Sequence, residues 1–545
     1  MILGLIIIAG VNVIGSFAFS RLDLTSEKRF TLSPVTKDLL KDLDDIIYVK
    51  VYLEGEFPAH FKRLRNSTRE MLDEFKVYGG SNIQYEFINP SENTNKKITE
   101  KIYENLSGSG LKPMAIEVQN ESKFSQQVIF PGALITYRDR QVPLMLLKEQ
   151  MGIRPEQQIN NSIETLEYGL ANSIRKLAVT AKPKVSFIEG HGELTEIQTA
   201  SITQSLNEYY QVDRITLNGQ LNSLKLTKAI IIAKPEKEFT EKDKFIIDQF
   251  IMKGGKVMWL IEPVQTNVDS LMKNQQTMAI GISQNLSDQL FKYGVRVNTD
   301  IIEDLQCASF PLTVPMNEGI KLFKWIYYPL ITNTTYHPMV KNLNAIKFQY
   351  VSSLDTVEAP GVKKTYLLRS SQFSRAIRAP LPIDIKTALM TPVQTAFNDP
   401  YKNVAVLLEG KFTSVFKNRL IDQISKDENI DYREESKPTK MIVVSDGDII
   451  RNDIHSTGKI YPLDKDKYTG QEYGNVDFFL NAMNYLTDNI DMLSIRSREL
   501  KMRLLNDNLI KKQKPVWQLI NTVLPILVVI CFGFIQVFLR RMKYS

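Results

Sequence analysis

The glycine-flanked pair His191 and Glu193 is the short motif of this sequence best suited to chemistry. It directly follows an apolar stretch, 185–188, that predicts a buried strand. A histidine beside a glutamate supports acid–base catalysis or metal ligation, and the flanking Gly190 and Gly192 let a substrate approach closely. The alternative is a tight strand-to-helix turn whose glycines adopt positive φ and whose histidine hydrogen-bonds locally.

Other carboxylates follow predicted strands and are candidates to join this motif. Glu189, Glu262 and Asp446 each stand at the predicted end of a strand. Asp446 and Asp448 offer oxygen ligands for a divalent cation, but the further acids of a calcium loop are missing, so a solvated turn is the alternative. We predict His191, Glu193 and Asp446 as ligand-binding residues, with no metal ion, no cofactor and no catalytic residue.

The sequence lacks the motifs of several classes of enzyme. A Gly-x-x-x-x-Gly-Lys-Ser/Thr loop is absent, so the chain is not itself a P-loop ATPase, and a Gly-x-Ser-x-Gly elbow is absent too. The two cysteines are Cys307 and Cys531, and the second lies in an apolar segment, so a disulfide between them is not expected.

The composition is that of a folded protein with membrane segments. The chain has 545 residues, of which 43% are hydrophobic and 24% charged, a balance that predicts several domains with their own cores. The net charge is +7, and Arg540, Arg541 and Lys543 supply three of these charges. The remaining sequence is only weakly basic, which argues against a nucleic-acid-binding protein.

We predict an α/β fold with two domains between membrane helices. Residues 21–181 contain a βαβ pattern (strand 46–53, helix 59–78, strand 83–88) and end in a long helix at 155–177, in an order that resembles a thioredoxin-like layout without its Cys-x-x-Cys. Residues 182–455 alternate strands and helices, which predicts a doubly wound, mostly parallel sheet, with a β-rich insertion at about 306–400 and a further strand at 411–419. Residues 456–514 form a membrane-proximal segment that includes a helix at 476–486.

Two apolar segments predict transmembrane helices, at 1–20 and 515–540. The second contains 24 residues, 516–539, without a charged side chain, and a helix of that length spans about 36 Å. A cleaved signal peptide is the alternative for the first. Both carry a stripe of small and polar residues that suits packing against other membrane helices. The stripe residues are Asn12 and Gly15 in the first helix, and Gln518, Thr522, Pro525, Gly533 and Gln536 in the second.

Basic residues flank the last helix on both sides. Arg496, Arg498, Lys501 and Arg503 precede it and suit phospholipid headgroups or an acidic partner, with simple snorkelling as the alternative. The short basic tail 540–543 is expected to stay cytoplasmic, which places both termini in the cytoplasm and the two domains outside it.

Six segments along nearly the whole chain share features with a known family: Arg21–Ser33, Gly190–Glu193, Gly254–Ile261, Val406–Phe412, Gly474–Asn481 and Ile495–Arg498. Through these segments the chain resembles the GldG family of gliding-motility proteins of Bacteroidota. The resemblance implies a two-pass inner-membrane auxiliary subunit of an ABC transporter, with periplasmic domains, a separate GldF-like permease and a separate GldA-like ATPase. The central α/β part is also similar to a domain of intraflagellar-transport proteins. Neither resemblance implies a catalytic residue.

Three hypotheses follow from the sequence. The first is a non-enzymatic ABC-transporter subunit whose periplasmic body binds a substrate or an envelope protein. The second is a periplasmic hydrolase centred on His191 and Glu193. The third is an envelope scaffold that binds no ligand.

Overall fold

The computed structural model describes residues 31–92, 95–120, 123–179, 181–220, 222–313, 319–332, 335, 337–417, 419, 432–487 and 507–544. The chain divides between Arg498 and Glu499 into two compact units, of which the second contains one long helix. The predicted helix at 1–20, with Asn12 and Gly15, lies outside the described residues. So do the basic residues Arg496, Arg498, Lys501 and Arg503.

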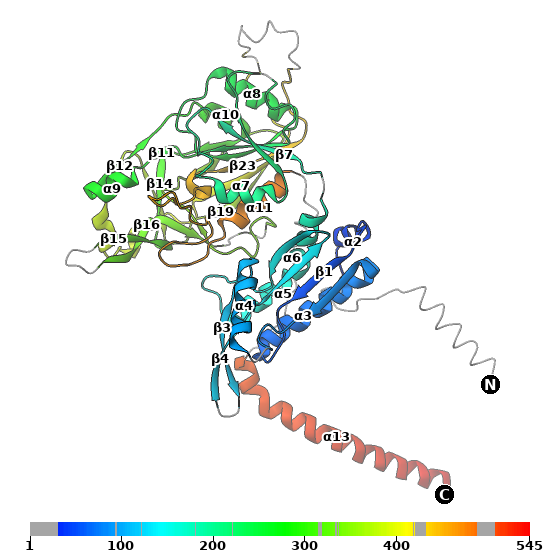
Figure 1. Cartoon of the computed structure of the whole chain (residues 1–545). Helices are drawn as coiled ribbons and strands as arrows, with labels where there is room; N and C mark the ends of the chain where they lie inside the picture. Colours follow the sequence, from blue (N-terminus) through cyan, green and yellow to red (C-terminus); the bar gives the residue numbers. More distant parts are fainter. Residues whose placement is uncertain are drawn as a thin grey trace. The chain divides into compact units, whose positions relative to one another are not determined.

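The first unit begins with an N-terminal lobe, residues 31–179 (Figure 1, blue to cyan). Its elements are α2 (Pro34–Lys41), β1 (Ile47–Val51), α3 (Ala59–Gly79), η1 (Gly80–Asn82), β2 (Ile83–Phe87), α4 (Lys96–Gly108), β3 (Met114–Asn120), β4 (Lys123–Ile129), β5 (Gly132–Tyr137), β6 (Arg140–Met145), α5 (Pro155–Glu164) and α6 (Leu166–Ala178). Four strands form a sheet in the order β2-β1-β5-β6, with β1 and β2 parallel and β5 antiparallel to both neighbours. The βαβ unit predicted from the sequence is therefore present.

The start of α2 shows how local sequence positions this lobe. The Ser33 side chain accepts a hydrogen bond from the Thr36 amide at 3.1 Å, and Pro34 occupies the first helical turn, where its missing N–H costs nothing. Glu167 of α6 then accepts hydrogen bonds from the Ser33 amide and the Thr36 hydroxyl. The cap predicted at Ser33 therefore also fixes α2 on α6.

The central lobe, residues 181–487, is built on a nine-stranded sheet. The strands run in the order β13-β18-β22-β23-β10-β9-β7-β8, and β19 also pairs with β22. Five neighbouring strands, from β23 to β8, are parallel, and the pairs on the other side of β23 are antiparallel. The bounds are β7 (Lys184–Glu189), β8 (Gln211–Thr216), β9 (Ala229–Ala233), β10 (Lys256–Leu260), β13 (Val295–Val297), β18 (Leu354–Thr356), β19 (Val362–Arg369), β22 (Asn403–Gly410) and β23 (Thr439–Val444).

Helices cover both faces of this sheet because its central strands are apolar on both sides. Successive residues of a strand point to opposite faces, so Ile231 and Ile230 enter different cores. The Ile231 core includes α7 (Ala200–Asn207) and α11 (Asn475–Leu486), and the Ile230 core includes α8 (Glu241–Met252) and α10 (Ser287–Tyr293). The predicted α/β class with a large, mostly parallel sheet is confirmed.

The β-rich part of the central lobe differs from the predicted insertion at 306–400. Strands β18 and β19, from within that range, join the large sheet. The remaining strands form small sheets around a third core that contains Trp325 and Phe310, and β11 already begins this part at Val264. The elements are β11 (Val264–Gln265), α9 (Val268–Asn274), β12 (Gln276–Gly281), β14 (Asp300–Asp304), β15 (Cys307–Thr313), β16 (Ile320–Ile331), β17 (Ile346–Lys347), β20 (Ser374–Arg378), β21 (Leu381–Asp384), η2 (Ile385–Leu389) and η3 (Gln394–Ala396).

Two predicted elements are wrong in detail. The predicted helix at 155–177 breaks at Thr165, whose hydroxyl donates to the Ser162 carbonyl and whose backbone leaves the helical region. The predicted strand at 411–419 is absent among its described residues, 411–417 and 419. There β22 ends at Gly410, whose φ of +138° and close approach to Gly361 leave no room for a side chain.

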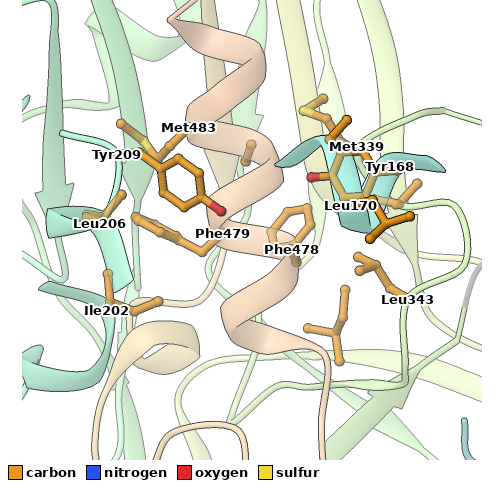
Figure 2. Close-up of a cluster of buried hydrophobic side chains, with 14 of the residues drawn as sticks. Tyr168, Leu170, Ile202, Leu206, Tyr209, Met339, Leu343, Phe478, Phe479 and Met483 are labelled. Atoms are coloured by element: carbon orange, nitrogen blue, oxygen red, sulfur yellow. The ribbon is translucent and has the colours of Figure 1, made fainter. Parts of the chain in front are cut away.

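Helix α11 joins the two lobes of the first unit. Figure 2 shows Phe479 and Met483 on the side of α11 that faces Leu206 of α7, while Phe478 faces a group that includes Tyr168 of α6. All five side chains belong to one hydrophobic core that contains residues of both lobes. The Tyr168 hydroxyl also donates to Asn481 of α11 at 3.3 Å. The part of the predicted membrane-proximal segment that forms α11 therefore belongs to the body.

The second unit contains α13, Asp507–Tyr544, with Pro515 and Pro525 inside it. Within Lys512–Met542, a stretch of 18 residues has a mean hydropathy of 2.6, and this segment is the one helix in the described chain that is long and apolar enough to cross a membrane. This length and composition suit a membrane anchor.

Candidate functional site

The strand order of the large sheet brings four loops to one edge. Strands β7, β9, β10 and β23 are adjacent and parallel, so their carboxyl ends share that edge. The residues that follow them include His191, Lys234, Glu262 and Asp446. His191 and Asp446, both predicted as site residues, therefore follow strands at the same edge of the sheet.

His191 is buried and fully engaged within the protein. Its Nδ1 lies 3.2 Å from Glu193 Oε1 and its Nε2 lies 3.3 Å from Asp243 Oδ2, and the ring stacks on Phe239 at a centroid distance of 3.6 Å. Burial by itself lowers the pKa of His191, but the two carboxylates outweigh burial and hold this pKa above its ordinary value. The two carboxylates therefore stabilise the imidazolium form of the ring, in which both N–H groups are directed at them.

The backbone of the same turn needs its glycines. Gly190 and Gly192 have φ values of +121° and +78°. The His191 amide donates to Glu193 Oε2 at 2.6 Å, and the His191 carbonyl accepts from the amides of Glu236 and Lys237 after β9. Through these hydrogen bonds, His191 connects the loop that follows β7 to the loop that follows β9. The arrangement matches the tight turn foreseen as the alternative to a reactive site.

Asp446 belongs to a second group, which we call the Lys234 cluster: Lys234, Glu262, Asp446, Asp448 and Arg451. The Lys234 ammonium lies 2.6 Å from Asp448 Oδ2 and 3.0 Å from Glu262 Oε2, and Arg451 approaches Asp448 at 3.3 Å. Asp446 accepts hydrogen bonds from the amides of Asp448 and Gln349. No contact between described residues joins Asp446 directly to His191 or Glu193.

The carboxyl groups of the Lys234 cluster have unusual protonation properties. Burial, with the charge of Asp448, raises the pKa of Asp446 to about 7. Burial and Asp448 also hold the pKa of Glu262 well above its ordinary value, although Lys234 opposes them. Lys234 has a φ of +54°, and a side chain at Gly447 would collide with it, so Gly447 is what lets this lysine enter the cluster. The cluster is a closed network whose cation the chain supplies itself.

A cavity of about 360 Å³ lies between the N-terminal and central lobes. We call it the interlobe cavity. Strand β6 and helix α6 contribute one wall, and α11 with the loop before it contributes another. Its volume is in the range of small-ligand sites in proteins. Polar side chains line it beside aliphatic ones, so it can accept a ligand that has both characters.

The small and polar residues of the predicted stripe share one face of α13, where Val529 lies between Pro525 and Gly533. Gln518, Thr522, Pro525, Gly533 and Gln536 follow one another at helical spacing, and the Thr522 hydroxyl donates to the Gln518 carbonyl. Within the second unit, α13 is the one described element, so no other described element of that unit covers this stripe. Pro525 also cannot donate to the carbonyl one turn earlier.

A family model described as an ABC-type uncharacterized transport system matches residues 182–482, more than half of the 545 residues. The chain belongs to this family. It is therefore an auxiliary component of an ABC-type transport system. The match covers the whole parallel part of the large sheet and α11 nearly to its end.

Other similarities extend the picture beyond the matched region. A domain of unknown function matches residues 26–136 of this ABC-transport auxiliary protein. An uncharacterized protein of Borreliella burgdorferi is 22% identical over 542 residues, which cover 97% of this chain and 95% of the relative. The mmIFT52 N-terminal domain aligns at 14% identity and a TM-score of 0.32, covering 56% of this chain and 97% of that domain.

Sequence reasoning missed three features of this auxiliary protein. Lys234 and Asp243 carry no motif, and only the fold shows that Lys234 pairs with Asp448 and that Asp243 pairs with His191. The interlobe cavity depends on contacts between segments that lie hundreds of residues apart. The third feature had a signal: Asn521 lies three residues after Gln518 and four before Pro525, so it extends the polar stripe.

Proposed function

We propose that this protein is a non-catalytic auxiliary subunit that docks through α13 on the permease of its ABC transporter. A GldF-like permease forms the channel, a GldA-like ATPase supplies the energy, and the body binds a substrate or an envelope protein. The proposal extends to gliding motility or envelope export, the roles that the GldG resemblance implies. The observation that carries it is the one-sided polar stripe on the only membrane-suited helix among the described residues of a family member.

The physical argument for docking concerns what drives helix association in lipid. Lipid chains are as apolar as leucine, so helices associate through close packing and interhelical hydrogen bonds. Gln518, Thr522 and Gln536 supply hydrogen-bonding groups, and Gly533 permits close approach of a neighbouring backbone. A simple anchor needs none of these.

The proposed topology places α13 in the inner membrane with the C-terminus in the cytoplasm and the body in the periplasm. Arg540, Arg541 and Lys543 at the end of the helix support this orientation through the positive-inside tendency. With the predicted helix at 1–20, the protein becomes a two-pass subunit with both termini in the cytoplasm. Accessibility of cysteines introduced at Ser545 and at exposed Glu70 to a membrane-impermeant maleimide, in a Cys307→Ser/Cys531→Ser background, tests the orientation.

The docking proposal is tested with leucine substitutions on the stripe. We expect the triple variant Gln518→Leu/Thr522→Leu/Gly533→Leu to reduce co-purification with the permease at least fivefold in mild detergent, with unchanged membrane insertion. The matched control places leucine on the opposite face, Ile520→Leu/Phe534→Leu/Phe538→Leu, and should retain the permease. Equal recovery of the permease with both variants would refute docking through the stripe.

The hydrolase hypothesis has a separate test. Both His191 ring nitrogens are held by carboxylates, which supports a positioning role for this residue instead of a reacting one. We expect His191→Gln to support transport in cells at normal levels when the protein accumulates normally. A His191→Gln protein that is stably folded, still recovers the permease and yet abolishes transport would favour the hydrolase.

A further inference from the structure

The interlobe cavity has an excess of carboxylates over available cations. Its lining contains three lysines and four acids: Lys112, Lys148, Lys176, Glu149, Asp464, Glu472 and Asp477. Lys112 forms an ion pair with Glu472. Lys176 pairs with Glu208, which lies outside the lining, at 2.5 Å. Two of the three lysines are thus already engaged by carboxylates.

With Glu472 paired, three carboxylates remain: the exposed Glu149, in the loop after β6, and the two aspartates Asp464 and Asp477, which lie near Glu472. Within the described chain, neither aspartate lies within ion-pair distance of a lysine or arginine. Burial raises the pKa of Asp464, Lys112 lowers it, and the charges of Glu472 and Asp477 raise it further. Three carboxylates therefore share this end of the cavity with one lysine. Placing a second cation there would relieve their repulsion.

The rest of the lining is aliphatic. Leu144 and Met145 of β6 face the cavity from the N-terminal lobe, and Val476 and Leu480 of α11 face it from the central lobe. All four are half-buried, so part of each side chain remains open to a ligand. An aliphatic stem placed between them gains about 25 cal/mol for each Å² of apolar surface removed from water.

We propose that the interlobe cavity binds an ammonium or guanidinium group on an aliphatic stem, with Asp464 and Asp477 as its counter-charges. The volume of about 360 Å³ accepts one lysine- or arginine-sized group with its neighbours. This chemistry has two sources: a free alkyl amine, or the basic side chain of a peptide segment. The inference gives a ligand class to the body of the proposed transporter subunit and in that sense rests on the proposed function.

The Lys234 cluster provides an internal precedent for this recognition. There, buried carboxylates surround the ammonium group of a lysine from the chain itself. In the cavity, the half-buried Asp464 and the exposed Asp477 line the open space without a paired lysine or arginine among the described residues. A ligand cation would pair with Asp464 and Asp477 in the way that Lys234 pairs with Asp448 and Glu262 in the cluster.

The test is titration calorimetry on the full-length protein in detergent. The probes are cadaverine, acetyl-Leu-Lys-Leu-amide, and the uncharged match acetyl-Leu-Gln-Leu-amide. We expect at least one cationic probe to bind at least tenfold more tightly than the glutamine peptide. Binding of the lysine peptide alone assigns a peptide source, and binding of cadaverine alone assigns a free amine.

The variants decide whether the cavity carries this binding. Asp464→Asn/Asp477→Asn is expected to weaken the cationic probe at least tenfold, and Asp477→Asn alone, at an exposed position, several-fold. Glu358→Gln, which changes an exposed acid outside the cavity, should leave binding unchanged. The inference is overturned if neither cationic probe binds at millimolar concentration, if the glutamine peptide binds equally well, or if a folded double variant binds like the parent protein. We expect the aspartate variants to lose probe affinity and still to co-purify with the permease. This readout distinguishes failure of the cavity inference from failure of the docking proposal.

Discussion

The Lys234 cluster and the interlobe cavity are both acidic regions of one compact unit, but they handle charge in opposite ways. In the cluster, Lys234 reaches Asp448 and Glu262 at 2.6 and 3.0 Å and water has little access. In the cavity, Asp464 faces open space beside Glu472 and Asp477. The paired carboxylates of the closed cluster stabilise one arrangement of loops. The carboxylates of the open cavity can instead attract a cation from outside the chain.

The largest effect is expected from removing the cation of the closed cluster. Lys234→Met leaves buried carboxylates without their counter-charge, which costs about 3 to 5 kcal/mol of unfolding free energy. Urea unfolding of the full-length protein measures this. Lys41→Met, which breaks an exposed pair with Asp38, serves as the control and should change stability by less than about 1 kcal/mol. A Lys234→Met effect as small as that of the control would contradict a closed, stabilising cluster.

The next effect concerns pH. Because the pKa of Asp446 is about 7 in the folded protein and near 4 when unfolded, the folded state binds more protons between these values, and stability falls as pH rises through this range. His191, whose pKa is also raised, changes stability in the same direction.

Asp446→Asn isolates the Asp446 contribution. We expect the parent protein to lose about 2 kcal/mol more stability than the variant between pH 5 and pH 8, measured by urea unfolding at each pH. His191 contributes to both proteins and cancels in the difference. Identical pH profiles would show that Asp446 titrates in the folded state as it does in the unfolded chain.

A smaller effect is expected at the edge of the cavity. Lys112→Met removes the partner of Glu472 from a largely exposed ion pair, so the unfolding free energy should change by less than about 1 kcal/mol. The released carboxylate should bind the cationic probe several-fold more tightly. Weaker probe binding by Lys112→Met in calorimetry would mean that this lysine does not compete with a ligand cation.

The smallest effect on stability is expected inside the cavity. Asp464→Asn removes a carboxylate whose charged form is disfavoured by burial, so stability should stay within about 0.5 kcal/mol or rise slightly, after allowance for solvent screening. Thermal unfolding checks this. A loss of stability comparable to that of Lys234→Met would show that the Asp464 carboxylate stabilises the fold and is not available to a ligand.

Period-2 and helical patterns in the sequence predicted much of the fold. They located the βαβ unit, the apolar parallel strands, α11 and α13, because these segments carry their own hydrophobic periodicity. The pattern could not show that Thr165 interrupts a helix, since a single residue leaves the apolar repeat intact. It also could not assign β18 and β19 to the large sheet, because strand pairing over long separations has no local signal.

The site was predictable only in part, for a related reason. His191 and Glu193 lie two residues apart in the sequence, and Gly190 and Gly192 mark their turn, so the motif was visible. Lys234 enters its cluster from another strand, and a positive φ on a lysine cannot be read from composition. The interlobe cavity involves both lobes, and its walls become neighbours only after α11 has packed against α6.

The position of α11 late in the chain determines when the core of the body can be completed during translation. Leu170 and Phe478 share one core, yet 308 residues separate them in the chain. At about 5 to 20 residues per second, a ribosome needs roughly 15 to 60 s to supply the second after the first. During that time, the apolar surface of the N-terminal lobe that packs against α11 stays uncovered. Helix α13 begins only 21 residues after α11 ends. The last part of the body core and the membrane-suited helix α13 are therefore synthesised within a short time of each other.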